Sequence, residues 1–198
     1  MRNVSRNFTF AVGPMLAILL LLGGTFAQGP GTTATRQKPI TIQAQAFGEA
    51  QQLGRNFGVD IIIEDYSTAD DQKALLEAFN AKQNEGLVNA LSKMKSKGRI
   101  SVTGTLGYDV AYIRKFPQPD GTTKLRIVTN RPIRFGEAWS DSRSMDYSLS
   151  GLEVILSTEE KKNSGTLLPA CQFKIDKEGQ LQIELLQNAW RLANVRIR

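Results

Sequence analysis

The stretch that decides the fold is residues 106–130, LGYDVAYIRKFPQPDGTTKLRIVTN. Large apolar side chains alternate with smaller or polar ones in its first half, which predicts one long strand. One face of that strand is expected to carry Leu106, Tyr108, Val110 and Tyr112, and the other Gly107, Asp109, Ala111 and Ile113. Residues 119–122 (PDGT) are typical of a turn, and residues 124–130 predict the returning strand.

Strand patterns continue on both sides of this hairpin. They cover residues 40–47, 58–66, 151–156, 166–176, 180–186 and 190–197. Hairpins between neighbouring strands predict a largely antiparallel sheet of about eight strands. Such a sheet hides its edges by curling toward a partial barrel or by splitting into a two-layer sandwich, and the sequence does not choose between them.

The last strand pattern changes parity within itself. Its apolar positions move from Trp190 and Leu192 to Val195 and Ile197. An extra residue near Ala193 and Asn194 restores the alternation, so we predict a β-bulge there.

One helical hairpin is predicted between residues 67 and 98. Ser67 and Thr68 precede Asp70 and Asp71 at the spacing of a helix start, and Leu75, Leu76 and Phe79 share one face. A second apolar stripe runs through residues 85–95 at Leu87, Val88, Leu91 and Met94. Lysines near its end, followed by Gly98, are typical stop signals. The predicted class is therefore α+β, with a single domain over residues 40–198.

The N-terminus has the pattern of a secretory signal peptide over residues 1–27. Arg2 and Arg6 precede the apolar run MLAILLLL (15–22), and small residues lead to a cleavage site after Ala27. The apolar run is too short to span a bilayer, which takes about 20 apolar residues. Residues 28–39 are rich in Gly, Pro and Thr and predict a flexible leader. We therefore expect a protein located outside the cytoplasm, either periplasmic or secreted.

Composition excludes several kinds of catalytic site. The chain has no histidine and one cysteine, Cys171. A Ser-His-Asp triad, a Cys-His dyad and a histidine-based zinc site are therefore impossible. No sequence motif indicates a cofactor or a metal. Cys171 alternates with polar neighbours alongside Phe173 and Ile175, so we predict a buried free thiol.

Residues 129–147 are the candidate ligand-binding segment, because they form a long connection that is dense in charged and aromatic side chains. Arginine forks and a tryptophan face can hold a carboxylate, a phosphate or a sugar. The alternative is a structural loop in which Phe135 and Trp139 cap the core. The candidate ligand-binding residues are Tyr108, Tyr112, Arg131, Arg134, Glu137, Trp139, Arg143 and Asp146.

An ion pair is expected to fix this segment against the neighbouring strand. Asp109 shares its predicted strand face with Ala111 and Ile113, and a buried carboxylate needs a partner. We predict a partly buried pair between one arginine and one acid of this group. The arginines are Arg131, Arg134 and Arg143, and the acids are Asp109, Asp141 and Asp146.

Three segments, GTLGYDVAY, PDGTTKLRIVTNRPI and SRSMDY, resemble parts of a group of uncharacterised exported bacterial proteins of about 200 residues. The resemblance covers roughly residue 59 to the C-terminus. It implies export and a single domain. No activity is attached to that group, so it implies no functional residues.

Three functions are compatible with these patterns. The first is an exported, non-enzymatic domain that binds a small ligand or an envelope protein. The second is a hydrolase that uses two carboxylates drawn from Asp109, Glu137, Asp141 and Asp146. The third is a structural component of the envelope. The net charge is +6, but the basic residues are scattered along the chain, so nucleic acid is not an expected partner. Membrane contact is expected only through the signal peptide before it is cleaved.

Overall fold

The computed structural model describes residues 38–131, 133, 148–184 and 189–198. The chain divides into two units, Met1–Thr35 and Arg36–Arg198, and every described residue belongs to the second. The predicted signal peptide and all but the last two residues of the predicted leader lie outside the described residues. Among the helices that are described, none is long and apolar enough to cross a membrane.

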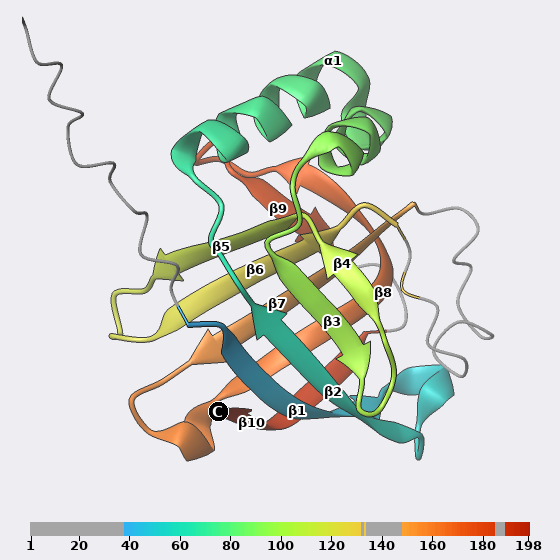
Figure 1. The fold of residues 1–198 in the computed structure, drawn as a ribbon, viewed down its shortest axis with the longest axis vertical. Helices are drawn as coiled ribbons and strands as arrows, with labels where there is room; N and C mark the ends of the chain where they lie inside the picture. The colour runs from blue at the N-terminus through green and yellow to red at the C-terminus, as the bar shows by residue number, and fades with distance from the viewer. Residues whose placement is uncertain (1–37, 132, 134–147, 185–188) are drawn as a thin grey trace, which may run out of the picture. The chain divides into compact units, whose positions relative to one another are not determined.

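The second unit is built on one antiparallel sheet (Figure 1). Its strands are β1 (Ile40–Gly48), β2 (Asn56–Ile63), β3 (Gly98–Val102), β4 (Tyr108–Val110), β5 (Tyr112–Pro117), β6 (Thr123–Thr129), β7 (Leu149–Leu156), β8 (Ser164–Ile175), β9 (Leu181–Glu184) and β10 (Trp190–Ile197). Two 3-10 turns, η1 (Ala50–Gln52) and η3 (Glu160–Lys162), join β1 to β2 and β7 to β8. The predicted antiparallel α+β class is confirmed.

The two outermost strands of the sheet are consecutive in sequence. The strand order is β4-β3-β2-β1-β10-β8-β7-β6-β5, with β9 paired to β8. Only Ala111 separates β4 from β5. The two ends of the sheet are therefore joined by the chain itself, and the sheet curls into a nearly closed barrel, as the first of the two predicted arrangements requires.

The prediction of one long strand over residues 106–113 is wrong. Leu106 is exposed, Tyr108 and Val110 belong to β4, and Tyr112 begins β5. The strand breaks at Ala111 because its first half pairs with β3 and its second half pairs with β6. A strand that changes partners must turn a corner, and the simple alternation of faces ends there.

Ser67 forms hydrogen bonds with backbone groups beside the break between β4 and β5. Its N–H donates to the Ile113 carbonyl oxygen at 2.7 Å, and its Oγ accepts from the Ile113 N–H at 3.0 Å. The Lys97 N–H donates to the Val110 carbonyl oxygen at 2.7 Å. These bonds supply part of the ladder that β4 and β5 do not make with each other.

The barrel interior is filled by apolar side chains from nearly every strand. The cluster comprises Ile42, Ala44, Ala46, Val59, Ile61, Ile63, Ile100, Val110, Ile113, Leu125, Ile127, Ile133, Leu152, Val154, Leu167, Trp190, Leu192 and Val195. Strands on opposite sides of the barrel contribute to this one cluster. Burial of these side chains is therefore the main force that closes the sheet.

The predicted bulge in the last strand is confirmed. Along β1 the register with β10 shifts between Gln43, which faces Arg196, and Gln45, which faces Ala193. Asn194 adopts a left-handed conformation with φ of 52°. The extra residue turns Val195 into the core and leaves Asn194 and Arg196 on the outside.

The predicted helical pair is a single helical element, α1 (Ala69–Lys93), that breaks at Lys82 and Gln83. Thr68 caps its start: Thr68 Oγ1 accepts from the Asp71 N–H, and the Asp71 carboxylate accepts from the Thr68 N–H. After the break the chain turns back, and the Asn84 side chain bonds the backbone of Phe173 in β8.

Gly98 is not the stop signal that the sequence indicated. The helix ends at Lys93 with Met94 as its C-cap, in extended conformation. Gly98 begins β3, where a Cβ would lie 2.1 Å from the carbonyl oxygen of Ile62. Glycine is required at this position by the close approach of two strands.

A second apolar cluster lies between α1 and the outer face of the barrel. It contains Leu75, Phe79, Leu87, Leu91, Ala111, Tyr112, Val128, Leu149, Leu168, Cys171, Phe173, Leu181 and Ile183. The parts of α1 before and after the break at Lys82 and Gln83, its first and second arms, both contribute apolar side chains to this cluster, as the two predicted apolar stripes require. The outer face of β1, β2 and β10 carries polar side chains instead, among them Gln43, Asp60 and Arg196.

Substitution of Gly86 by alanine tests the turn within α1. Alanine normally stabilises a helix relative to glycine by about 1 kcal/mol. Here a Cβ at Gly86 would lie 2.0 Å from the carbonyl oxygen of Ala78 in the first arm. We therefore expect Gly86→Ala to lower the free energy of urea unfolding by about 1–3 kcal/mol. Asn89→Ala, at an exposed position of the same arm, is the control and is expected to change it by less than about 0.5 kcal/mol. A stabilised Gly86→Ala protein would show that the two arms do not touch.

The prediction that Cys171 is buried and free is confirmed. Its side chain is 1% exposed, and burial raises the pKa of its thiol well above the ordinary value. The thiolate is the reactive form, so we expect labelling of the native protein at pH 8 to be at least about a hundredfold slower than in denaturant. Equal rates would show that the α1 side of the barrel opens readily.

Candidate functional site

Three of the eight predicted ligand-binding residues are described. Arg134, Glu137, Trp139, Arg143 and Asp146 lie outside the described residues, so their role stays a prediction. Tyr108, Tyr112 and Arg131 can be placed, and they do not converge. Arg131 is exposed, and its Nε donates to the Asn130 side chain at 3.3 Å.

The strand break separates the two tyrosines. Tyr108, in β4, is half-buried against the interior cluster. Tyr112, in β5, is 3% exposed and packs in the outer cluster under α1. Desolvation by burial raises the pKa of the Tyr112 hydroxyl, opposed by the nearby Arg114 guanidinium. Tyr112 thus has the surroundings of a core residue.

Asp109 does not have the environment that the sequence indicated. Its carboxylate lies 2.9 Å from the Arg99 guanidinium, and both side chains are largely exposed. The expectation that Asp109 is buried is therefore wrong, since cross-strand pairing places Arg99 opposite it at an exposed position. Arg134 and Arg143, two of its expected partners, lie outside the described residues. Asp141 and Asp146 lie outside the described residues.

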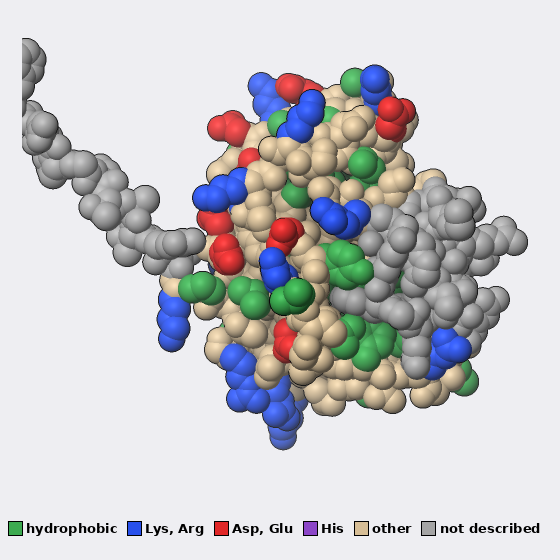
Figure 2. All heavy atoms as spheres, turned by 45° about the vertical axis from the view of Figure 1, so that its right-hand side comes forward, with side chains coloured by type: hydrophobic (Ala, Val, Ile, Leu, Met, Phe, Trp, Pro, Cys, Tyr) green, Lys and Arg blue, Asp and Glu red, His purple; other side chains and the backbone are tan. Residues whose placement is uncertain are grey.

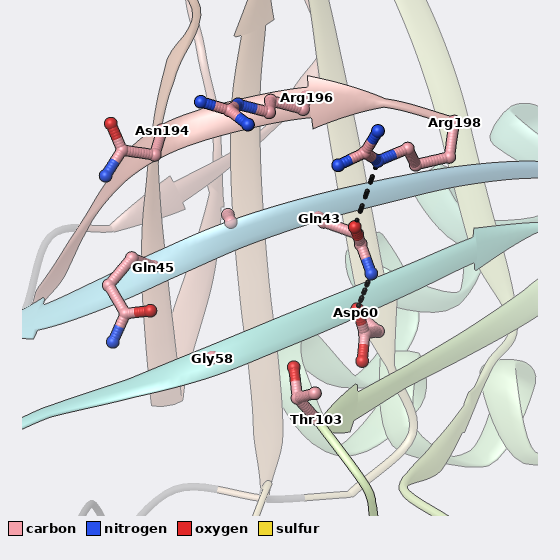
Figure 3. Close-up of a pocket in the computed structure, with 9 residues that line it drawn as sticks. Gln43, Gln45, Gly58, Asp60, Thr103, Asn194, Arg196 and Arg198 are labelled. Carbon is pink, nitrogen blue, oxygen red and sulfur yellow. Dashed lines mark hydrogen bonds between the residues drawn. The ribbon is translucent and has the colours of Figure 1, made fainter.

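One concave site is a groove of about 400 Å³ on the outer face of β1, β2 and β10 (Figure 3). It is lined by Gln43, Ala44, Gln45, Gly58, Asp60, Thr103, Asn194, Arg196 and Arg198. Gln43 lies at its centre: its amide nitrogen donates to Asp60 at 3.0 Å, and its amide oxygen accepts from Arg198 Nε at 3.2 Å. The groove is therefore polar and contains both signs of charge.

The second concave site lies at one end of the barrel and holds about 340 Å³. We call it the mouth. It is lined by Ile40, Ile42, Ile63, Tyr66, Lys115, Gly121, Thr123, Leu125, Leu156, Ser157, Thr158 and Ile197. Ile42, Ile63 and Leu125 belong to the interior cluster, so the mouth opens directly onto the apolar core. Figure 1 shows the β5–β6 and β7–β8 connections at the same end of the barrel.

Lys115 is the charged side chain of the mouth. Its Nζ lies 3.9 Å from the centroid of the Tyr66 ring. No aspartate or glutamate lines the mouth, and Lys115 makes no ion pair with any described residue. The rim of a largely apolar cavity thus presents one cation that is held by an aromatic face.

Within the described ranges, no group of three His, Cys, Asp or Glu side chains is placed to hold a metal ion. Acidic and basic side chains lie interspersed over the α1 side of the molecule (Figure 2). Among the described residues the most buried cation is Arg126, which is 4% exposed. It pairs with Glu153 at 2.7 Å on the outer face and also donates to the Leu181 carbonyl oxygen of β9.

Sequence reasoning did not find either concave site. The one sequence signal that points to the mouth is the alternation in the predicted strand 40–47, which places Ile40 and Ile42 on the same face. The remaining residues of the mouth come from β2, β5, β6, β7 and β10 and from the connections between them.

Comparison with known proteins gives no relative. No protein-family model matches the chain, no curated protein is similar to it, and no solved structure matches its fold.

Proposed function

We propose that this chain is an exported binding protein that takes a small, largely apolar molecule with an acidic group into the mouth of its barrel. The observation that carries the proposal is the composition of the mouth, in which isoleucine and leucine side chains surround a cavity with one uncompensated lysine at its rim. Ligand sites of proteins are typically such apolar concavities with a few polar groups, and the mouths of β-barrels are a common place for them.

The dimensions of the mouth set the size and affinity of the ligand. A cavity of about 340 Å³ is near the lower end of ligand sites. Burial of roughly 200–300 Å² of apolar ligand surface contributes about 5–8 kcal/mol before the entropic cost of association. Since the entropic cost of association offsets much of this gain, a dissociation constant of about 1 mM or weaker is expected.

The charge at the rim favours an anionic head group. The Tyr66 ring holds the Lys115 ammonium in place. Because Lys115 has no ionic partner among the described residues, the carboxylate of an incoming ligand can pair with it. An exposed ion pair of this kind contributes up to about 1 kcal/mol. The acidic group therefore orients the ligand, while the apolar body supplies most of the affinity.

The test is a titration of the purified chain with decanoate and with decanol, using displacement of the anionic probe 1-anilinonaphthalene-8-sulfonate. Thr123→Trp should abolish binding of both, because Thr123 has the inward parity of Leu125 and lines the mouth. Lys115→Gln should weaken decanoate about threefold to fivefold and leave decanol unchanged. Lys174→Gln, an exposed lysine outside the mouth, is the matched control. Unchanged decanoate binding in Thr123→Trp would refute the proposal.

A further inference from the structure

The polar groove on the outer face of β1, β2 and β10 is a separate site from the mouth. It lies on the side of the sheet opposite to the interior cluster, and no residue lines both. Two features of the backbone hollow it out. The bulge at Asn194 turns Val195 into the core, and Gly58 contributes no side chain to its floor.

The charged groups of the groove form a row across three strands. Arg196 faces Gln43 in the register of β10 with β1, and Gln43 faces Asp60 in the register of β1 with β2. Neighbouring strands lie about 4.8 Å apart, so the row spans about 10 Å between its terminal Cα atoms. It carries a guanidinium at one end, an amide in the middle and a carboxylate at the other end.

Several groups in this row retain hydrogen-bonding capacity. Arg196 is exposed and has no hydrogen bond or ion pair with any described residue, and Arg198 bonds Gln43 only through Nε (Figure 3). Asp60 accepts from the neutral Gln43 amide and makes no ion pair with the described residues. The bonds to Arg198 and Asp60 hold the Gln43 amide in one orientation, so the donors and acceptors around it are preorganised.

The chemistry of the groove selects its ligand. Two guanidinium groups suit an oxyanion, and carboxylate, amide and hydroxyl groups suit a ligand with several hydroxyls. Asp60 disfavours a multiply charged phosphate by repulsion, and the lining surface is more polar than apolar, which disfavours a purely hydrophobic molecule. We propose that the groove binds an acidic sugar, with the carboxylate of the sugar at Arg196 and Arg198 and a hydroxyl of the sugar donating to Asp60.

The test is a chemical-shift titration of the chain with glucuronate, with glucose and with inorganic phosphate. We expect glucuronate to perturb the backbone amides of residues in β1, β2 and β10 at the groove and to bind at least about tenfold more tightly than glucose. Arg196→Gln should weaken glucuronate binding about tenfold or more, because it removes a charge-assisted hydrogen bond. Arg191→Gln, an exposed arginine of the same strand outside the groove, should leave it unchanged.

Asp60→Asn separates a sugar site from a simple anion site. This variant loses the strong acceptor for a hydroxyl and also the repulsion of anions. Glucuronate binding should weaken about threefold, whereas phosphate binding should strengthen by a similar factor. Equal binding of glucuronate and phosphate by the wild type, or glucuronate binding that Arg196→Gln leaves intact, would overturn the proposal. Thr123→Trp fills only the mouth, so its groove should bind glucuronate normally, and the two proposals fail independently.

Discussion

Replacement of Trp190 by alanine is expected to lower the free energy of unfolding by about 3–5 kcal/mol, measured by urea denaturation. Trp190 is among the largest fully buried side chains, with 0% exposure, and it belongs to the interior cluster. Its ring packs on Phe57 with centroids 4.7 Å apart. Alanine would leave a cavity inside a nearly closed barrel, where the surrounding strands cannot easily collapse to fill it.

Two further variants test whether packing accounts for the loss: a conservative substitution at Trp190 and a control at the adjacent residue. The Trp190 Nε1 has no hydrogen-bond partner among the described residues. Trp190→Phe keeps an aromatic ring beside Phe57, so we expect it to cost at most about half as much as alanine. Arg191→Ala alters the adjacent exposed residue and is expected to cost no more than about 1 kcal/mol, the range of its contact with the Phe47 ring. A Trp190→Ala protein within 1 kcal/mol of wild type would be incompatible with a packed barrel interior.

The second large effect is expected at Gly98. Gly98→Val should destabilise the protein by about 3 kcal/mol or more, or prevent its folding, because the new Cβ would lie 2.1 Å from the Ile62 carbonyl oxygen. Gly98 pairs with Ile63 on one side and with Val110 on the other, so neither neighbouring strand is free to move away. Urea denaturation measures the loss, and the soluble yield reports a failure to fold.

Milder variants keep this prediction testable if the valine protein does not fold. Gly98→Ala introduces the same Cβ and should still cost about 1–3 kcal/mol. Gly121→Ala provides the contrast: its φ is 81° and no atom lies within 4 Å of its Cβ position, so it reports conformational strain alone, about 1 kcal/mol. A Gly98→Ala cost below that of Gly121→Ala would contradict the close approach of β2 and β3.

Local patterns predicted most of the secondary structure. Alternation placed β1, β2, β6, β7 and β10 within a few residues of their ends, and the gap between the predicted strands 166–176 and 180–186 is the turn that joins β8 to β9. The Thr68–Asp71 cap and the bulge at Asn194 were also predicted, as was the burial of Cys171. Each depends on residues that are neighbours in sequence, so their spacing is sufficient to reveal them.

The predictions that were wrong depend on partners that are distant in sequence. Residues 106–113 alternate regularly, but they break at Ala111 because β4 and β5 pair with different strands. Gly98 has the pattern of a helix stop, but the position of Ile62 is what requires glycine there. Asp109 was expected to be buried beside an arginine of residues 131–143, but the register of β3 with β4 places Arg99 opposite it on an exposed face.

The sequence by itself determined an antiparallel α+β protein with a buried thiol and a bulged last strand, because hydrophobic periodicity and turn chemistry act over a few residues. Only the tertiary structure decided that the sheet curls into a nearly closed barrel rather than splitting into a sandwich, and that Lys115 lies at a largely apolar mouth. It also decided that Arg196, Gln43 and Asp60 lie in one row. These arrangements depend on strand order and register over the whole domain, which follow from the packing of one shared core and not from any single segment.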